Sequence, residues 1–503
     1  MSEVITTTLP PLRDLPLGAL GAPGDTPARL DVFLAGTEDE AGEIWFGGAW
    51  SRLRQETVHL RLLIDRDIAR LDAAICAQIN AILHHANFKA LESAWRSIYW
   101  LAGSLGPDEL TQLRVLDCSW PELARDLERS PEFDLSVTFD KIYNQEFGTP
   151  GGTPYSLLVG LYDIRARPSR DRPVDDIAVL RQLGAVAAAA FAPVILSASA
   201  EMLGVDKFGG LDRRLSAAAL FRTTEYSRFN ALRETPETRF LGLACPGVLM
   251  RKPYVGRASG NCGFAFDEQI MDADRDLLWG HAGIALAQVS LRAFEDYRWL
   301  AAIRGVIQDE EAGGVVVDLP RVDFGVDAPD TVWQYPLQVS FTEAMERELA
   351  DAGLISIRKC PYTPHVAFNV LPSLNRPKGA YQLDTANQNE RMSSMLNYVL
   401  CVSRFAHYVK VIARDWVGSY MSPEECQTRL NRWLSTYCTS GEGLSFELRA
   451  RYPLASADVQ VRAAPGQPGA YECVMLLKPH LQLDQANAEF QLVTTVHGVE
   501  KAL

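Results

Sequence analysis

A glycine-rich segment, Gly148 to Pro154, is the first place where this sequence could bind a ligand through its backbone. A phosphate-binding loop needs a run of backbone N–H groups, then a lysine for the phosphates and a serine or threonine for magnesium. The segment reads GTPGGTP, lacks a Gly-Lys-Ser/Thr ending, and contains two prolines that have no N–H to donate. It therefore predicts a rigid turn into a strand at Tyr155 and not a nucleotide site.

Three aspartates, Asp272, Asp274 and Asp276, have the alternate spacing with which a calcium-binding EF-hand loop begins. Such a loop also needs glycine at its sixth position and glutamate at its twelfth, where this chain has Leu277 and Gly283. Carboxylates just ahead of a helix commonly stabilise its positive end. We expect that capping role here.

The histidines and cysteines do not form a recognisable catalytic or metal-binding motif. His84 and His85 are adjacent, so on a helix they point about 100° apart and make a poor pair of ligands. Cys262 has no nearby base to activate it. Three further histidines stand alone in apolar surroundings and are interpreted as core or interface residues: His281, His365 and His407. We expect no catalytic residue, metal site or cofactor, although a cytosolic α/β enzyme with an unrecognised active site remains an alternative.

The composition narrows the class of protein. Lys and Arg total 49 against 63 Asp and Glu, a net charge of -14, which argues against coating nucleic acid or an anionic membrane through charge. None of the nine cysteines forms a CxxC pair, which indicates a reducing compartment. The N-terminus does not resemble a signal peptide, and the uncharged stretch 184–200 is interrupted by Pro193. These features predict a cytoplasmic protein without membrane insertion.

Short apolar runs alternate with amphipathic segments, a pattern that predicts an α/β (mixed α+β) fold. We expect helices over 51–85, 88–101, 119–129, 177–190 and 277–297, and strands over 113–117, 155–161, 194–196, 240–244 and 299–305. The first helix carries an apolar stripe that should lie against a core or another helix. Its members are Leu60, Ile64, Ile68, Leu71, Ile75, Ile79 and Ile82.

Segments rich in proline and glycine divide the chain into three expected parts. Residues 1–50 are a flexible arm with a linker strand, in which residues 29–34 form a short strand or a helical turn. An α/β region follows over 51–370. A C-terminal domain over 371–503 begins with a helix at 389–416, has a helix start at Ser422 and Pro423, and ends in strands at 471–477 and 489–496.

Seven blocks of the sequence, in order from about residue 60 to 495, together resemble one family. They are 78–96 (beginning QINAILHH), 139–160 (FDKIYNQEFGTPGGTPYSLLVG), 191–194 (FAPV), 239–254, 278–305 with LWG and AAIRG, 403–453 with SRFAHY, NRW and RYP, and 478–483 (KPHLQL). The family is the large subunit of the type VI secretion contractile sheath, called TssC, VipB or ImpC. Residues 1–58 and the tail after Val496 match its pattern poorly, and His281 stands where the family usually has asparagine.

The resemblance implies a mechanical role in the bacterial cytosol, with no catalytic site in this chain. Such subunits pair with a small sheath subunit of the TssB/VipA type and stack into a helical tube around an inner tube of Hcp-type hexamers. The sheath assembles on a membrane-attached baseplate, and its contraction drives the inner tube and spike into a target cell. A ClpV-type ATPase then dismantles it, mainly through the small subunit. The sheath of a phage-like contractile injection particle is an alternative.

Two sets of residues are the expected contacts of such an assembly. Exchanged strands would use Leu30, Val32, Tyr471, Cys473, Met475, Phe490, Leu492 and Val496. The terminal strands could instead close the C-terminal domain's own sheet, and both readings can hold together. The helix at 389–416 would bury a stripe in that domain and at the small subunit: Met395, Val399, Val402, Phe405 and Val409.

Overall fold

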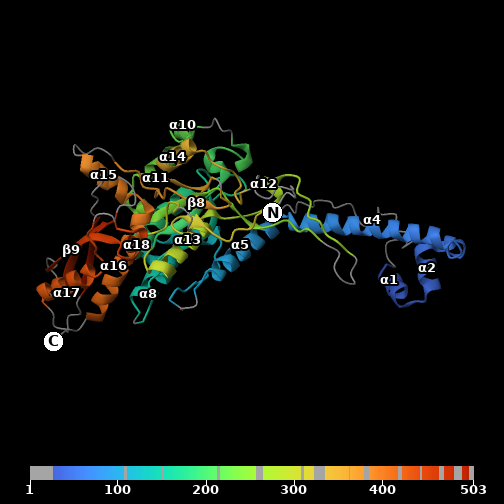
Figure 1. Ribbon diagram of the computed structural model, residues 1–503, viewed down its shortest axis with the longest axis horizontal. Helices are drawn as coiled ribbons and strands as arrows, with labels where there is room; N and C mark the ends of the chain where they lie inside the picture. The colour runs from blue at the N-terminus through green and yellow to red at the C-terminus, as the bar shows by residue number, and fades with distance from the viewer. Residues whose placement is uncertain are drawn as a thin grey trace. The chain divides into compact units, whose positions relative to one another are not determined.

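The computed structural model in Figure 1 describes residues 26–106, 110–149, 151–211, 216–256, 264–307, 311–321, 335–361, 363–378, 384–416, 422–441, 444–463, 470–480 and 490–497. The chain divides into two compact units. The first combines residues 1–91 with 253–276, and the second combines residues 92–252 with 277–503.

A mixed six-stranded sheet forms the centre of the second unit and confirms the expected α/β class. Its strands are ordered β1 (Leu158–Ile164), β2 (Val194–Ala198), β3 (Leu241–Cys245), β7 (Leu354–Lys359), β8 (Val366–Phe368) and β6 (Val315–Val316). The first four run parallel, with Val194 opposite Leu158 on one side and Leu241 on the other. β8 runs antiparallel to both β7 and β6.

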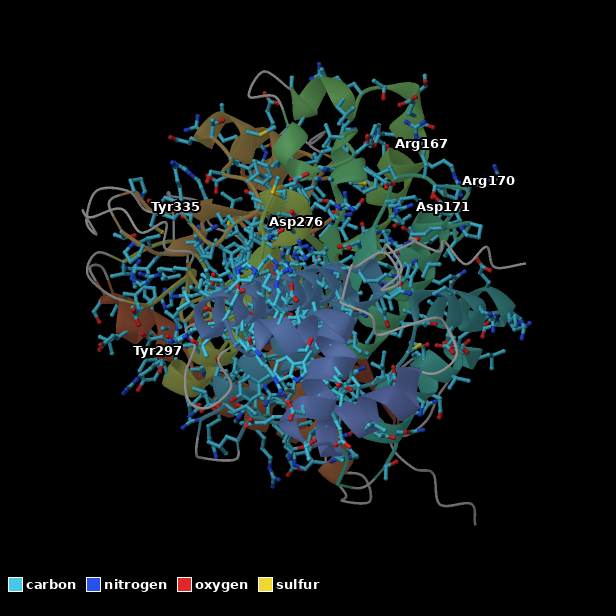
Figure 2. All side chains as sticks on the ribbon, turned by 90° about the vertical axis from the view of Figure 1, so that its right-hand side faces the viewer. Arg167, Arg170, Asp171, Asp276, Tyr297 and Tyr335 are labelled. Atoms are coloured by element: carbon cyan, nitrogen blue, oxygen red, sulfur yellow. The ribbon has the colours of Figure 1, made fainter. Side chains whose placement is uncertain are left out.

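Helices cover both faces of this sheet, as buried parallel strands require. Neighbouring residues of a strand point to opposite faces. Leu196 of β2 therefore packs in the core that contains α9 (Asp176–Ala190), and Ile195 packs in the core that contains α13 (Ala282–Tyr297). The loop from β1 to α9 is exposed at Arg167, Arg170 and Asp171, which project outward in Figure 2.

The remaining elements of the second unit are shorter. They include α6 (Trp120–Arg129), α7 (Val137–Phe139), the π-helical turn η4 (Asp140–Asn144), α8 (Gln145–Phe147), α10 (Ala217–Leu220), α11 (Ser227–Arg233), α14 (Glu343–Asp351), and the antiparallel pair β4 (Val248–Arg251) and β5 (Leu278–Gly280). Five 3-10 turns also occur among the described residues of this unit: Phe133–Leu135, Ala200–Leu203, Phe208–Gly210, Thr224–Tyr226 and Pro236–Phe240. α6 begins at the expected Ser119, whose side chain forms a capping box with Glu122.

The C-terminal part of the second unit is built from three strands and the helices against them. β9 (Leu454–Ala463), β10 (Ala470–Pro479) and β11 (Phe490–His497) form an antiparallel sheet in the order β11-β10-β9. α15 (Asp384–Ser393), α16 (Leu396–Trp416), α17 (Pro423–Ser435) and α18 (Phe446–Arg451) accompany it. Leucines of α17 and alternate residues of β10 share one core with α16.

Most described residues of the first unit are helical, whereas residues 253–256 and 264–272 form loops joined by a bridge between Val255 and Asp267. It contains α1 (Thr26–Ala35), α2 (Glu38–Phe46), a 3-10 turn at Gly47–Ala49, α3 (Trp50–Leu53), α4 (Thr57–Leu83) and the start of α5 (Ala86–Gly103), with α12 (Ala273–Asp276) later in the chain. Residues 29–34 lie within α1, so of the two expected alternatives the helical turn is found and the linker strand is not. Leu, Arg and Ala favour helix in this segment, and Pro27 occupies the first turn, where its missing N–H costs nothing.

Three other expectations from the apolar pattern are wrong. Residues 113–117 form neither a strand nor a helix. Residues 299–305 are mostly buried but form no strand. Gly305 donates to the Phe368 oxygen at 2.8 Å and accepts from the Gly314 N–H at 2.7 Å. The helix expected at 277–297 begins at Ala282, after β5. Apolar patterning reports burial, whereas a strand also needs a neighbour that completes its hydrogen bonds.

Candidate assembly interface

The glycine-rich segment closes around a carboxylate of this chain. Glu146 pairs with Arg114, and its Oε2 accepts a hydrogen bond from the Thr153 backbone N–H at 2.9 Å. A Cβ atom on Gly152 would lie 2.2 Å from the Glu146 backbone oxygen, so this close approach requires glycine. The turn thus leads into β1, as expected, with its backbone engaged by protein groups.

A lysine of α16 occupies an aromatic cage beside this turn. The Lys410 ammonium nitrogen lies 5.0 Å from the ring centre of Tyr143, 4.9 Å from that of Phe147 and 4.7 Å from that of Phe191. It also donates to the Ala189 backbone oxygen at 3.4 Å. Burial lowers the pKa of Lys410 to about 8, while the three ring faces favour its cationic form.

A buried histidine lies one turn earlier on the same helix. Nε2 of His407 donates to the Ala190 backbone oxygen at 3.0 Å, because a carbonyl can only accept. Burial lowers the pKa of His407 to about 4. His407 and Lys410 therefore bind the last carbonyls of α9, which have no partners within their own helix. The contact fixes α16 to the end of α9 and resembles no catalytic arrangement.

The acidic triplet acts as a local cap. Asp276 accepts hydrogen bonds from the backbone N–H groups of Met271 at 2.8 Å and Asp272 at 2.9 Å. Asp272 accepts in turn from the Asp274 N–H at 3.1 Å. Among the residues that the structure describes, no three histidine, cysteine or carboxylate side chains are arranged to hold a metal ion.

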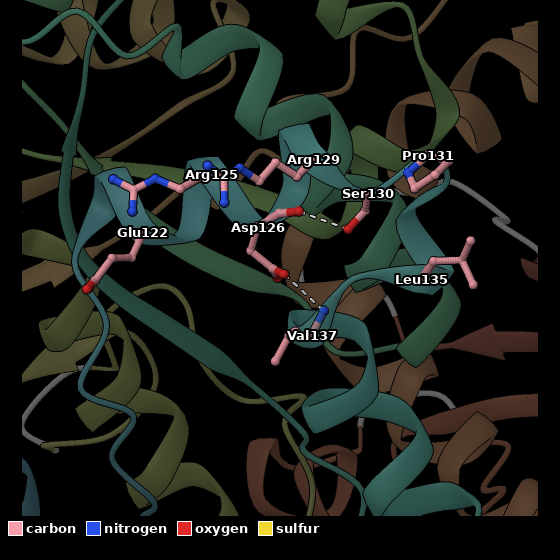
Figure 3. Close-up of a pocket in the computed structure, with 8 residues that line it drawn as sticks. All are labelled: Glu122, Arg125, Asp126, Arg129, Ser130, Pro131, Leu135 and Val137. Atoms are coloured by element: carbon pink, nitrogen blue, oxygen red, sulfur yellow. Dashed lines mark hydrogen bonds between the residues drawn. The ribbon is translucent and has the colours of Figure 1, made fainter.

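A surface hollow beside α6 also lacks features of a ligand site (Figure 3). Asp126, which lines it, accepts hydrogen bonds from the Val137 N–H at 3.1 Å and the Thr138 hydroxyl at 2.6 Å. The Ser130 hydroxyl donates to the Asp126 backbone oxygen at 2.9 Å, which ties the end of α6 to the following turn. The polar groups of Asp126 are thus used to connect two short helices.

The expected helix stripe is buried, but its helix is broken. Val399, Val402, Phe405 and Val409 are all buried on α16. Met395 lies between α15 and α16, where the chain leaves helical geometry. The Leu396 N–H donates to the Leu371 oxygen at 2.8 Å in place of a helical partner. The continuous helix expected over 389–416 is therefore wrong, because a distant segment takes up its backbone groups.

The expected terminal strands lie side by side in the C-terminal sheet. Tyr471 pairs with Val496, Met475 with Leu492, and Leu477 with Phe490. Cys473 and Met475 face the core; the side chains of Tyr471, Phe490, Leu492 and Val496 lie outside the described part of the structure. The strands do close a sheet of their own domain. β9 was missed, although the alternation of Ala457, Val459 and Val461 could have indicated it.

The outer edge of β11 is a site where another strand could add. Within the described residues, β11 pairs on one side with β10 and has no strand on its other side. An unpaired edge presents a row of backbone donors and acceptors to a neighbouring chain. Of the residues expected to join such an exchange, Leu30 and Val32 lie instead on helix α1.

A second candidate surface is the apolar stripe of α4, which does not lie against a core as expected. Four of its isoleucines are exposed: Ile64, Ile68, Ile75 and Ile82. Large apolar side chains exposed along one helix in this way mark a surface that other proteins cover.

Comparisons with known proteins identify the family of this chain. The VipB family model described as EvpB/VC_A0108, tail sheath N-terminal domain, matches residues 65–375, and the one described as tail sheath gpW/gp25-like domain matches residues 385–496. The chain is 34% identical over 443 residues to the type VI secretion system sheath protein TssC1 of Pseudomonas aeruginosa, covering 87% of each chain. No helix in the described ranges is long and apolar enough to cross a membrane. The chain belongs to the TssC/VipB family of large sheath subunits of type VI secretion systems, which are structural proteins and not enzymes.

Proposed function

We propose that this chain pairs with a small sheath subunit of the TssB/VipA type and builds the wall of a contractile tube. Its family supports the role, and the observation that carries the mode of assembly is the one-sided pairing of β11. Strand addition at this edge joins subunits through backbone hydrogen bonds while leaving their globular parts free to rotate. Such a joint suits a wall that must change its packing without falling apart.

The exposed apolar stripe of α4 is the proposed binding surface for helices of the small subunit. Leu60, Leu71 and Ile82 recur at intervals of 11 residues, which correspond to three helical turns of about 3.67 residues each. This period lies close to the natural helical repeat, so the apolar stripe follows α4 with little drift around its axis. A helix of the partner can then bury the exposed isoleucines along much of its length.

The remaining partners follow from the same role. The tube would surround an inner tube of Hcp-type hexamers, grow from a membrane-attached baseplate in the bacterial cytosol, and be dismantled after contraction by a ClpV-type ATPase acting through the small subunit. The work of contraction would come from a difference in packing between two states of the lattice. Nucleic acid and direct membrane insertion have no part in this proposal.

Negative-stain electron microscopy tests the pairing. The chain is expressed alone and together with a candidate small sheath subunit of the TssB/VipA type, and both samples are imaged after purification. We expect long hollow tubes in the co-expressed sample alone. Tubes formed by this chain by itself would instead indicate a one-component sheath, as in phage-like particles. Single particles in both samples would contradict the proposal.

A further inference from the structure

The second edge of the C-terminal sheet is occupied by side chains of a helix. β9 pairs with β10 along one side, and α17 packs along its other side. Asn431 of α17 contacts a single residue of β9 twice. Its Oδ1 accepts from the Val459 N–H at 3.0 Å, and its Nδ2 donates to the Val459 oxygen at 3.3 Å. This pair of bonds reproduces what a neighbouring strand would offer.

A second amide continues the same pattern along β9. Oε1 of Gln427 accepts from the Val461 N–H at 3.2 Å. Gln427 and Asn431 are four residues apart on a helix, a rise of about 6 Å. Val459 and Val461 are two residues apart on a strand, about 6.8 Å. The two side chains therefore match successive outward-facing backbone groups of the edge.

Backbone groups cover the beginning of the same edge. The Thr439 N–H donates to the Leu454 oxygen at 2.9 Å, and the Leu454 N–H donates to the Tyr437 oxygen at 3.3 Å. β9 is thus engaged near both of its ends, at Leu454 and at Val459 to Val461, by residues 427–439. At the opposite edge of the sheet, β11 has no further strand beside it among the described residues.

We propose that Asn431 and Gln427 are an edge guard, which closes β9 so that the sheet can be extended only past β11. The proposal rests on the proposed function, since it assigns a direction to the strand exchange described there. Without the guard, the open β11 edge of a second copy of this chain would fit the exposed β9 edge. Such a head-to-tail contact does not close on itself and would propagate into fibres of the large subunit alone.

The double variant Asn431→Ala, Gln427→Ala removes the guard while leaving Leu430 and Leu434, the buried anchors of α17, in place. The matched control, Thr428→Ala with Arg432→Ala, removes two exposed side chains from the same helix. In complexes with the small subunit, amide hydrogen exchange at Val459 and Val461 should rise about tenfold in the double variant and stay unchanged in the control. Size-exclusion chromatography with light scattering should show concentration-dependent self-association of the double variant only.

A proline distinguishes an opened edge from general damage. In the double variant, Val461→Pro removes the outward N–H that Gln427 had bound, and it should block strand addition at β9 and abolish the self-association. Self-association that persists after Val461→Pro is added to the double variant would overturn the proposal. So would a double variant whose amide hydrogen exchange at Val459 and Val461 is faster but which does not self-associate. If the double variant fails to fold, Gln427→Ala alone gives the same test with one bond removed. Tubes formed by the wild-type chain with the small subunit would support the proposed function independently of the outcome for the edge guard.

Discussion

At the scale of single residues, Phe405 shows how completely the C-terminal core depends on one ring. Its side chain is 0% exposed and stacks on Trp299 with ring centres 4.1 Å apart. Trp433 and Tyr437 meet it edge-on at 6.1 and 5.9 Å. Contacts of this kind add to the free energy already gained by burying the ring.

Phe405→Asp should therefore prevent stable folding of the C-terminal domain. The change leaves a cavity and an unpaired buried charge, which together cost at least about 4 kcal/mol. We expect little soluble chain and no recovery with the small subunit in a co-expression pull-down. Leu448→Asp, at a 44% exposed position on α18, is the control and should behave as wild type. Equal yields of the two variants would contradict the importance of the Phe405 cluster.

His407 should make the chain sensitive to acid. Burial, and less strongly the neighbouring Arg404 and Lys410, lower its pKa in the folded chain to about 4, against 6.5 when exposed. Between these values the unfolded chain binds a proton that the folded chain does not, so stability falls as pH falls from 6.5 towards 4. The full difference corresponds to roughly 3 kcal/mol.

Thermal unfolding at pH 7.5 and 5.0 measures this effect. His407→Gln can still donate to the Ala190 oxygen but cannot titrate, so its melting temperature should fall less on acidification than that of wild type. His59→Gln, at an exposed position on α4, controls for the loss of a histidine and should follow wild type. Identical pH dependence in His407→Gln and wild type would contradict the prediction, because it would show that folding does not lower the pKa of His407.

At the scale of elements, the sequence predicted correctly those helices and strands that are determined by residues within or next to them. Ser422, Pro423 and Glu425 predict the start of α17, and the structure has the capping box there. The strand predicted over 471–477 is found as β10, in which Cys473 and Met475 are buried. In each case the residues that determine the element lie within or next to it.

The failures have distant causes. The apolar periodicity continues through Met395, yet the helix stops because Ser373 binds the Ser394 oxygen through its N–H at 2.9 Å and its hydroxyl at 2.6 Å. The edge guard was missed for the same reason, since Asn431 and Val459 are 28 residues apart. An amide side chain on a helix gives no sign in the sequence that it will bind a strand.

At the scale of the whole molecule, a charge introduced into the apolar stripe of α16 should affect folding, whereas a charge introduced into the stripe of α4 should affect assembly. The stripe of α16 is buried within the chain, whereas Ile68 and Ile75 of α4 are 49% and 46% exposed. A charge on α4 therefore costs the isolated chain little, because the side chain already contacts water. In the assembled tube it would be buried against a partner helix without a counter-charge.

Ile68→Glu with Ile75→Glu should leave folding intact and abolish pairing with the small subunit. The variant's helix content by circular dichroism and its melting temperature should match wild type within about 2 °C, while co-purification of the small subunit falls to background. Ala73→Glu with Ala77→Glu adds the same charge on the other side of α4, at exposed positions, and should retain pairing. Retained pairing in the isoleucine variant would exclude the stripe as the seat of the partner, and loss of folding would mean that the stripe packs within this chain. A variant that folds but does not pair would place the recognition of the small subunit on α4, separate from the strand exchange at β11.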